Sequence, residues 1–154
     1  MSSIPNFQIS KHFSFHEMTT TNKLAFLLDN AIKAVPYLYD MTNFLRNTIE
    51  PIRDFFGVYF TVTSGFRCEG LNNIIKGEKT SYHLRGLAID IALYDLKFEH
   101  YVDVCNYIAQ YFTFGKLILE KKDGVIWIHI QDGKECIYYH FIEGAKKVIK
   151  VKNV

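Results

Sequence analysis

Two short apolar-rich runs on either side of an Asp-Gly pair constrain the fold of this chain more than any other sequence feature. The runs are KLILEK at 116–121 and VIWIHI at 125–130, and both have the length and composition of β-strands. Asp123-Gly124 between them is a strong signal for a two-residue hairpin turn. The sequence therefore predicts an antiparallel hairpin, and the pairing of its residues can be counted outward from the turn.

The segments before this hairpin predict helices followed by strands. Apolar residues between 24 and 56 recur at intervals of three and four, which is typical of helices, and we expect two helices there. The second begins near Pro36, is kinked or restarted at Pro51 and ends at Gly57. Further on we expect a strand at 59–63, a short helical piece at 71–75, a strand at 86–93 and a helix at 98–112.

The C-terminal part predicts a third strand, CIYYHFI at 136–142, after a second turn at Asp132-Gly133. Helices come early and strands late, so the predicted fold class is α+β. We expect a small single domain, with a central antiparallel sheet formed by this meander of C-terminal strands and with the N-terminal helices packed on it. The domain covers residues 1–154, with residues 1 to about 20 as an N-terminal arm.

Composition and charge exclude several classes of protein. The 18 basic and 16 acidic residues give a net charge of +2, too near balance for the basic stripe of a nucleic-acid-binding protein. The three cysteines form no CxxC pair, and their odd number favours synthesis in a reducing compartment. The sequence shows no secretory signal and no run of ~18 apolar residues. We expect a monomer that is made in a reducing cytoplasm and is not inserted into a membrane.

Asp90 follows His83 in the segment SYHLRGLAID. In the strand predicted there, Leu87, Ile89 and Ile91 form an apolar stripe, so Asp90 faces the other way among small residues. A carboxylate among small side chains marks a face with open space beside it. An Asp on a solvated face is the alternative that this pattern leaves open.

His129 has a comparable position in VIWIHI, where the isoleucines form the core stripe and Trp127 and His129 share the opposite face. A single His in a strand is more often structural than a ligand. Two His and one Asp on faces away from the core nevertheless fit a catalytic zinc site, which uses three protein ligands and leaves a fourth position to water. The candidate zinc ligands are therefore His83, Asp90 and His129.

Glu120 is placed by counting back from the hairpin turn. If Asp123-Gly124 are the two central residues, Glu120 lies directly opposite Trp127 and diagonal to His129. That position suits a base that acts on water beside a metal. A surface Glu next to two lysines is the alternative.

Other residues carry weaker signals. Arg67 in TSGFR follows a predicted strand, where its guanidinium could hold a substrate carboxylate through two hydrogen bonds. His12 and His16 have the i, i+4 spacing of a helical metal pair, but no convincing third ligand is near them in the sequence. The aromatic run at 138–141 is expected to serve core and sheet packing.

The motifs around the candidate residues resemble those of the M15 peptidases. The pattern SxHxxGxAxD covers residues 81–90, and WxH covers residues 127–129. SKHFSFHEM, IEPIRDFFG and TSGFR followed by Leu71-Asn72 resemble the subgroup called peptidase M15 type 3, and the resemblance extends from about residue 9 to residue 131. Members include D-Ala-D-Ala carboxypeptidases, dipeptidases and phage endolysin endopeptidases.

The resemblance implies roles for single residues. It implies a small α+β domain whose zinc ligands are His83, Asp90 and His129. Arg67 would contact a substrate carboxylate, Ser81 would be a supporting polar residue near the site, and Trp127 would contact the substrate. Many members place the catalytic acid three residues before the second His, but that position here is Ile126, which cannot transfer a proton. The related hedgehog zinc fold takes its Glu from the preceding strand, which matches Glu120. Asp123, at the tip of the turn, is the alternative acid.

The resemblance also implies a function. We expect a zinc-dependent peptidase from a phage or bacterium that acts at the cell wall on stem peptides of peptidoglycan, as a carboxypeptidase or as an endolysin-type endopeptidase. Two alternatives remain open, a non-catalytic zinc-binding module of the same fold and a wall-binding component of a virion. A competent carboxylate at Glu120 distinguishes the enzyme from the non-catalytic module.

Overall fold

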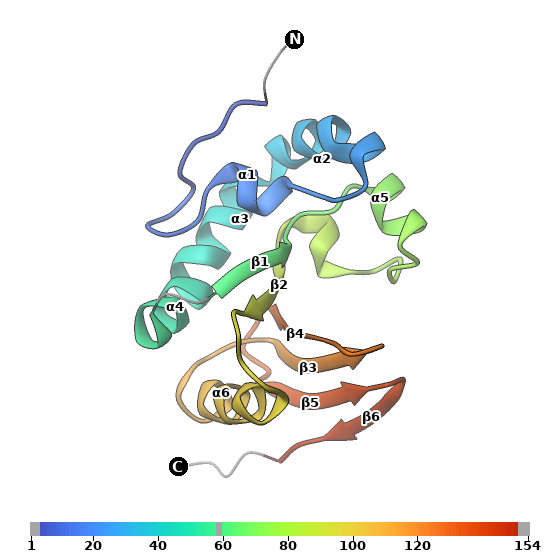
Figure 1. The fold of residues 1–154 in the computed structure, drawn as a ribbon. Coiled ribbons are helices and arrows are strands. Elements are labelled where there is room, and N and C mark those ends of the chain that lie inside the picture. The colour runs from blue at the N-terminus through green and yellow to red at the C-terminus, as the bar shows by residue number, and fades with distance from the viewer. Residues whose placement is uncertain (1–3, 58–59, 151–154) are drawn as a thin grey trace.

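The computed structural model describes residues 4–57 and 60–150, which form a group of helices beside a six-stranded sheet (Figure 1). The helices are α1 (Phe15–Thr19), α2 (Leu27–Ala34), α3 (Leu38–Phe44), α4 (Glu50–Phe56), α5 (Glu69–Ile74) and α6 (Phe98–Tyr111). The strands are β1 (Phe60–Ser64), β2 (Ala88–Leu93), β3 (Lys116–Lys122), β4 (Val125–Gln131), β5 (Ile137–Ile142) and β6 (Ala145–Val148). The predicted α+β class is confirmed, while the start of the predicted first strand, at Tyr59, lies outside the described residues. No helix in the described part of the chain is both long enough and apolar enough to cross a membrane.

The chain from residue 24 to residue 56 is helical almost throughout, as the spacing of its apolar residues predicts. A 3₁₀ turn at Val35–Tyr37 joins α2 to α3, and a π-helical turn at Leu45–Ile49 joins α3 to α4. Pro36 and Pro51 each stand within the first two residues of a segment at which the helical geometry changes, the positions where a helix tolerates proline best. Gly57, with a φ of 70°, ends α4 as expected.

The antiparallel hairpin of β3 and β4 has the register that was counted from the sequence. Glu120 pairs with Trp127 across the turn, and His129 is the next residue of β4 on that face. Asp123 and Gly124 have φ values of 51° and 80°, the left-handed conformation that tight hairpin turns require. The prediction that Glu120 shares a face of the sheet with His129 is confirmed.

The predicted meander is wrong in one respect, because β5 does not pair with β4. It pairs in parallel with β3, and the strand order is β1-β2-β4-β3-β5-β6. The other edge of β4 is already bonded to β2, so the open edge of the hairpin belongs to β3. The chain therefore crosses the start of β3, where the Ile137 N–H donates to the Gly115 carbonyl at 3.0 Å. Asp132-Gly133 lies in this crossover and not in a hairpin turn, and the sheet is mixed.

The last strand, β6, was not predicted from the sequence. It pairs antiparallel with β5 through a turn at Glu143-Gly144, whose φ values are 47° and 80°. All four residues of β6 are exposed and two of them are lysines, so the apolar alternation of a half-buried strand is missing. Lysines on an edge strand discourage pairing with a further chain.

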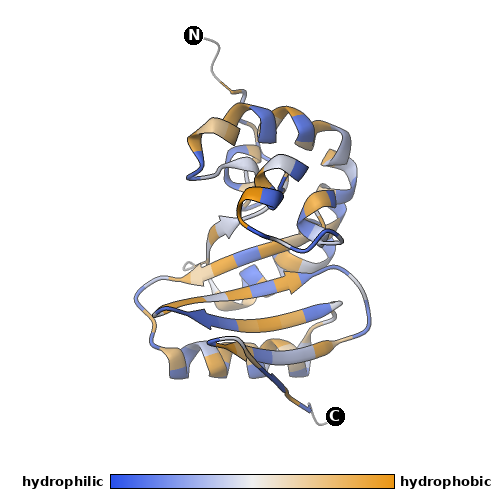
Figure 2. Ribbon diagram, turned by 90° about the vertical axis from the view of Figure 1, so that its right-hand side faces the viewer, coloured by the Kyte–Doolittle hydropathy of each residue, from blue (hydrophilic) through white to orange (hydrophobic). Residues whose placement is uncertain are grey.

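The two faces of the sheet have different surroundings. Helix α6 packs against β3 and β4 (Figure 1), and Leu117, Leu119, Ile128 and Ile130 are fully buried on that side. Figure 2 shows single hydrophilic residues among the hydrophobic ones of the strands, and successive side chains of a strand point to opposite faces. The face away from α6 is therefore the one on which the polar candidate residues lie.

Part of the segment that was expected to form an N-terminal arm is built into the fold. Phe15 and Met18 of α1 are buried, and a capping box of Ser14 and Glu17 begins that helix. The Phe66 N–H donates to the Met18 carbonyl at 2.7 Å. This contact joins α1 to the TSGFR segment after β1, which in turn supports the candidate site.

Candidate metal centre

His83 is held in one orientation by the backbone around it. It lies in a 3₁₀ helix, Tyr82–Arg85, whose N-cap residue is Ser81. The Ser81 hydroxyl accepts a hydrogen bond from the His83 backbone N–H at 3.3 Å. The His83 ring donates from Nδ1 to the Gly65 carbonyl at 2.7 Å. Because a carbonyl can only accept, Nδ1 carries the proton and Nε2 carries a lone pair. A Cβ on Gly65 would stand 2.4 Å from the Met18 carbonyl oxygen, so this approach requires glycine.

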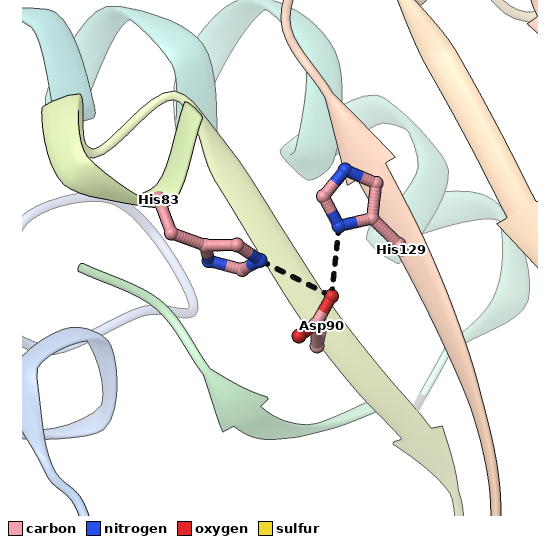
Figure 3. Close-up of side chains that lie close together, drawn as sticks. All are labelled: His83, Asp90 and His129. Atoms are coloured by element: carbon pink, nitrogen blue, oxygen red, sulfur yellow. Dashed lines mark hydrogen bonds and ion pairs between the residues drawn. The ribbon is translucent and has the colours of Figure 1, made fainter. Parts of the chain in front are cut away.

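Asp90 and His129 face each other across the β2–β4 pair. One carboxylate oxygen of Asp90, Oδ1, lies 2.9 Å from His129 Nδ1 and 3.3 Å from His83 Nε2. Figure 3 shows the two rings converging on this oxygen from the 3₁₀ helix and from β4. The structure thus brings together all three predicted zinc ligands.

Burial and mutual contacts shift the pKa values of these three groups. Burial lowers the pKa of His83, which favours the neutral imidazole that binds metals. Burial opposes ionisation of Asp90, but its contacts with His83 and His129 outweigh burial and hold the Asp90 pKa well below its usual range. For His129 the hydrogen bond to Asp90 outweighs burial, and its pKa is raised. Metal binding at this centre would therefore release a proton.

The three side chains fit a metal ion. One ligand atom from each of His83, Asp90 and His129 lies within 4.8 Å of the other two. In the described part of the chain, His83 Nε2 is the one buried side-chain polar atom that lacks a hydrogen-bond partner. The Asp90 oxygen 3.3 Å away does not serve as one, because it and Nε2 both present lone pairs. An unsatisfied buried polar atom costs roughly 1–3 kcal/mol, which a bond to a metal would offset. Two His and one carboxylate are a donor set of catalytic zinc sites.

Arg67 binds the other oxygen of the Asp90 carboxylate. Its Nη2 donates to Asp90 Oδ2 at 2.9 Å, and its Nε donates to Ser64 Oγ at 2.9 Å. Arg67 thereby fixes the side of Asp90 that points away from the two rings, as outer-shell partners of metal ligands do. Arg67 also lines the cleft described below. Its contact with a substrate carboxylate stays a prediction.

Glu120 and Trp127 form a pair beside the candidate ligands. The Trp127 indole N–H donates to Glu120 Oε2 at 2.7 Å, which orients the carboxylate. Burial, and then the negative charge of Asp90, raises the pKa of Glu120. A carboxyl group with a raised pKa can both accept and return a proton near neutral pH.

These residues lie in one cleft of about 600 Å³ on the open face of the sheet. Seven of its lining residues are predicted from the sequence, and the ones that are not include Lys116, Gln131, Tyr139, Phe141 and Lys146. Within the aromatic run at 138–141, Tyr138 is buried as expected, whereas Tyr139 and Phe141 line the cleft. Strand alternation predicts that Tyr138 faces one side of β5 and that Tyr139 and Phe141 face the other. That this other side borders the cleft depends on the pairing of β5 with β3, which was not expected.

A second group of metal-binding residue types lies where the N-terminal segment meets α4, namely His12, Glu50 and Asp54. Here protein donors already satisfy the Glu50 carboxylate. Ser10 Oγ and the His12 N–H donate to its Oε1 at 2.6 and 2.7 Å, and His12 Nδ1 lies 2.6 Å from its Oε2. Lys11 Nζ lies 3.2 Å from Asp54 Oδ1. These contacts fasten the N-terminal segment to α4.

Comparison with known families agrees with the site. The model of a family described as Peptidase M15 matches residues 11–131, which is more than half of the chain. The matched region contains His83, Asp90, His129 and Glu120, and it ends at Gln131, the last residue of β4. A comparison with curated proteins found no match. The chain belongs to the peptidase M15 family.

Proposed function

We propose that this protein is a zinc-dependent peptidase that cleaves the stem peptides of bacterial peptidoglycan. Membership of the M15 family makes it a hydrolase of the metallopeptidase kind. The observation that carries the zinc proposal is the unpartnered, buried Nε2 of His83, beside Asp90 and His129 at one cleft. The peptidoglycan substrate rests on the resemblance of the sequence motifs to family members that act on cell walls.

The side chains divide the work of peptide hydrolysis. His83, Asp90 and His129 would hold the zinc ion, which supplies Lewis-acid chemistry by polarising the scissile carbonyl and acidifying water. Glu120 takes a proton from the water that adds to the carbonyl carbon. The same carboxyl group gives that proton to the leaving amine as the C–N bond breaks. Its raised pKa suits both steps.

Neighbouring groups keep these residues in position. The indole N–H of Trp127 fixes the Glu120 carboxylate, and Arg67 fixes the Asp90 carboxylate. Preorganised groups of this kind lower the barrier because they need not reorient during the reaction. This arrangement supports a catalytic site more than a structural one, since a structural zinc site has four protein ligands.

Digestion of purified wall peptides tests the proposal. The zinc-loaded protein is incubated with muropeptides of several peptidoglycan types, and the products are identified by mass spectrometry. We expect cleavage of one kind of peptide bond, loss of cleavage with a chelator and recovery on addition of zinc. A zinc-loaded protein that cleaves no wall peptide across the panel would contradict the proposal and favour the non-catalytic module.

A further inference from the structure

The outer wall of the cleft is built by a part of the chain that lies beyond the family match. The match ends at residue 131, whereas β5 and β6 occupy 137–142 and 145–148. Tyr139 and Phe141 of β5 and Lys146 of β6 line the same cleft as the candidate zinc ligands. These strands therefore add to the centre a surface that the family match does not cover.

The register of the sheet places this surface next to Glu120. Phe141 pairs with Glu120 on one side and with Lys146 on the other. Adjacent strands are spaced by ~4.8 Å, so the backbone of Lys146 lies roughly 10 Å from that of Glu120. An extended peptide advances ~3.3 Å per residue, and Lys146 is thus within about two or three residues of the scissile bond.

Lys146 also has a defined neighbour. Its ammonium lies 4.4 Å from the centre of the Tyr139 ring, a cation–π contact that keeps the charge over the cleft wall. Phe141 is 39% exposed beside it. Burial, and then the charges of Glu120 and Glu78, raises the pKa of Tyr139, so its hydroxyl keeps its proton and can donate a hydrogen bond.

The charges of the cleft favour an anionic group at this wall. Arg67 is engaged with Asp90, whereas Lys116 and Lys146 belong to no ion pair among the residues described. The acidic lining residues outside the zinc centre are Glu120, which the mechanism uses, and the exposed Glu78. A substrate carboxylate is thus attracted to the two lysines and repelled by the Glu78 and Glu120 carboxylates.

We propose that Lys146, with Tyr139 and Phe141 beneath it, is a specificity subsite that binds a free carboxylate of the peptide substrate within two or three residues of the scissile bond. This subsite rests on the proposed peptidase function and deepens it. Such a subsite selects peptides whose carboxylate is free over peptides whose carboxylate is amidated. Lys116, four residues before Glu120 on β3, supplies a second cation to the lining of the same cleft. The ammonium binds the carboxylate, and the aromatic rings pack against the apolar part of the same residue.

The test uses stem peptides in matched pairs. The two members of a pair differ only in whether one carboxylate, within two or three residues of the scissile bond, is free or amidated. Lys146→Ala removes the proposed contact, and Lys147→Ala is the control, because Lys147 pairs with His140 and so faces the opposite side of β6. Binding is measured by calorimetry on zinc-loaded Glu120→Gln protein, with and without each lysine substitution. The kcat/KM values are measured on protein with Glu120 intact.

We expect Lys146→Ala to weaken binding of the carboxylate peptide about three- to fivefold, the size of a partly exposed ion pair, with the amidated peptide unaffected. In the kinetics the loss should appear in KM, and Lys147→Ala should change neither peptide. Equal losses for both peptides, or no preference in the parent protein, would overturn the subsite. If the wild-type protein cleaves neither peptide while the binding preference depends on Lys146, the peptidase proposal fails and the subsite stands.

Discussion

Two clusters of histidine and carboxylate side chains in this protein have similar composition and differ in how their polar atoms are hydrogen-bonded. In one, His83, Asp90 and His129 converge at a cleft, and a buried ring nitrogen has no hydrogen-bond partner. In the other, His12 and Glu50 are neighbours of Asp54, and the Glu50 carboxylate receives three contacts from protein donors. Residue types and proximity are alike in the two clusters, and what differs is a ligand atom left without a partner. We expect this unmet bonding capacity to decide which of the two clusters binds a metal.

Replacing Glu by Gln beside the first cluster and within the second should give opposite results. We expect Glu120→Gln to lower turnover at least ~10²-fold, because the proton acceptor is lost, with zinc content and melting temperature little changed. Glu50→Gln should leave turnover of the folded protein unchanged and lower the stability by about 1–3 kcal/mol, because buried charged hydrogen bonds are weakened. Peptide cleavage, zinc analysis and thermal unfolding of both variants check this. Wild-type rates in Glu120→Gln would remove Glu120 from the mechanism.

Arg67→Lys tests how the zinc centre is supported. An ammonium cannot hold both Asp90 and Ser64 as the guanidinium does, so we expect zinc affinity or kcat/KM to fall about ten- to 100-fold with little change in melting temperature. Zinc titration separates the two roles of Arg67. A weaker zinc affinity indicates that it positions Asp90, whereas a higher KM confined to carboxylate substrates indicates the predicted substrate contact. Unchanged values of both would exclude either role.

Glu50 of the second cluster should make the free energy of unfolding depend on pH. Burial opposes ionisation of Glu50, but hydrogen bonds from Ser10 and His12 outweigh it, and its pKa is lowered from 4.5. A lowered pKa in the folded state stabilises the protein above the unfolded pKa, and this stability is lost as the pH falls through the folded value. The free energy of unfolding should therefore decline below about pH 4.5, and Glu50→Gln should remove part of that decline. A variant with the same pH profile as the wild type would refute this role.

Trp127→Phe should have a smaller effect on catalysis than Glu120→Gln or Arg67→Lys. It keeps an aromatic ring and removes the N–H that donates to Glu120, so we expect kcat/KM to fall by about three- to tenfold. Because that hydrogen bond lowers the Glu120 pKa, its loss raises the pKa further. Glu120 acts as a base when ionised, so the acid limb of the kcat/KM profile should move to higher pH. A limb that stays in place would separate Trp127 from Glu120.

Local patterns were sufficient to place Asp90, Glu120 and His129 on the face of the sheet away from the core. The face of each strand follows from alternation, and the Asp-Gly turn fixed the register that places Glu120 opposite Trp127. These features depend on residues that are close in the sequence. The same patterns also predicted the helices between residues 24 and 56 and their end at Gly57.

Features that depend on distant segments were not predicted. The pairing of β5 with β3 follows from the occupation of the other β4 edge by β2, which no local pattern reports. The contact of His12 with Glu50 joins residues 38 positions apart. The strand β6 has no apolar alternation, and its existence depends on the edge that β5 offers. The outer wall of the cleft was missed for these reasons.

Zinc content in two histidine variants tests the central contrast most directly. Purified wild-type protein, His83→Ala and His12→Ala are dialysed against limiting zinc, and metal is measured by elemental analysis alongside circular dichroism to confirm folding. The structure predicts about one zinc per chain in the wild type and in His12→Ala, and none in folded His83→Ala. Full zinc content in His83→Ala, or its loss in folded His12→Ala, would contradict the assignment of the metal centre.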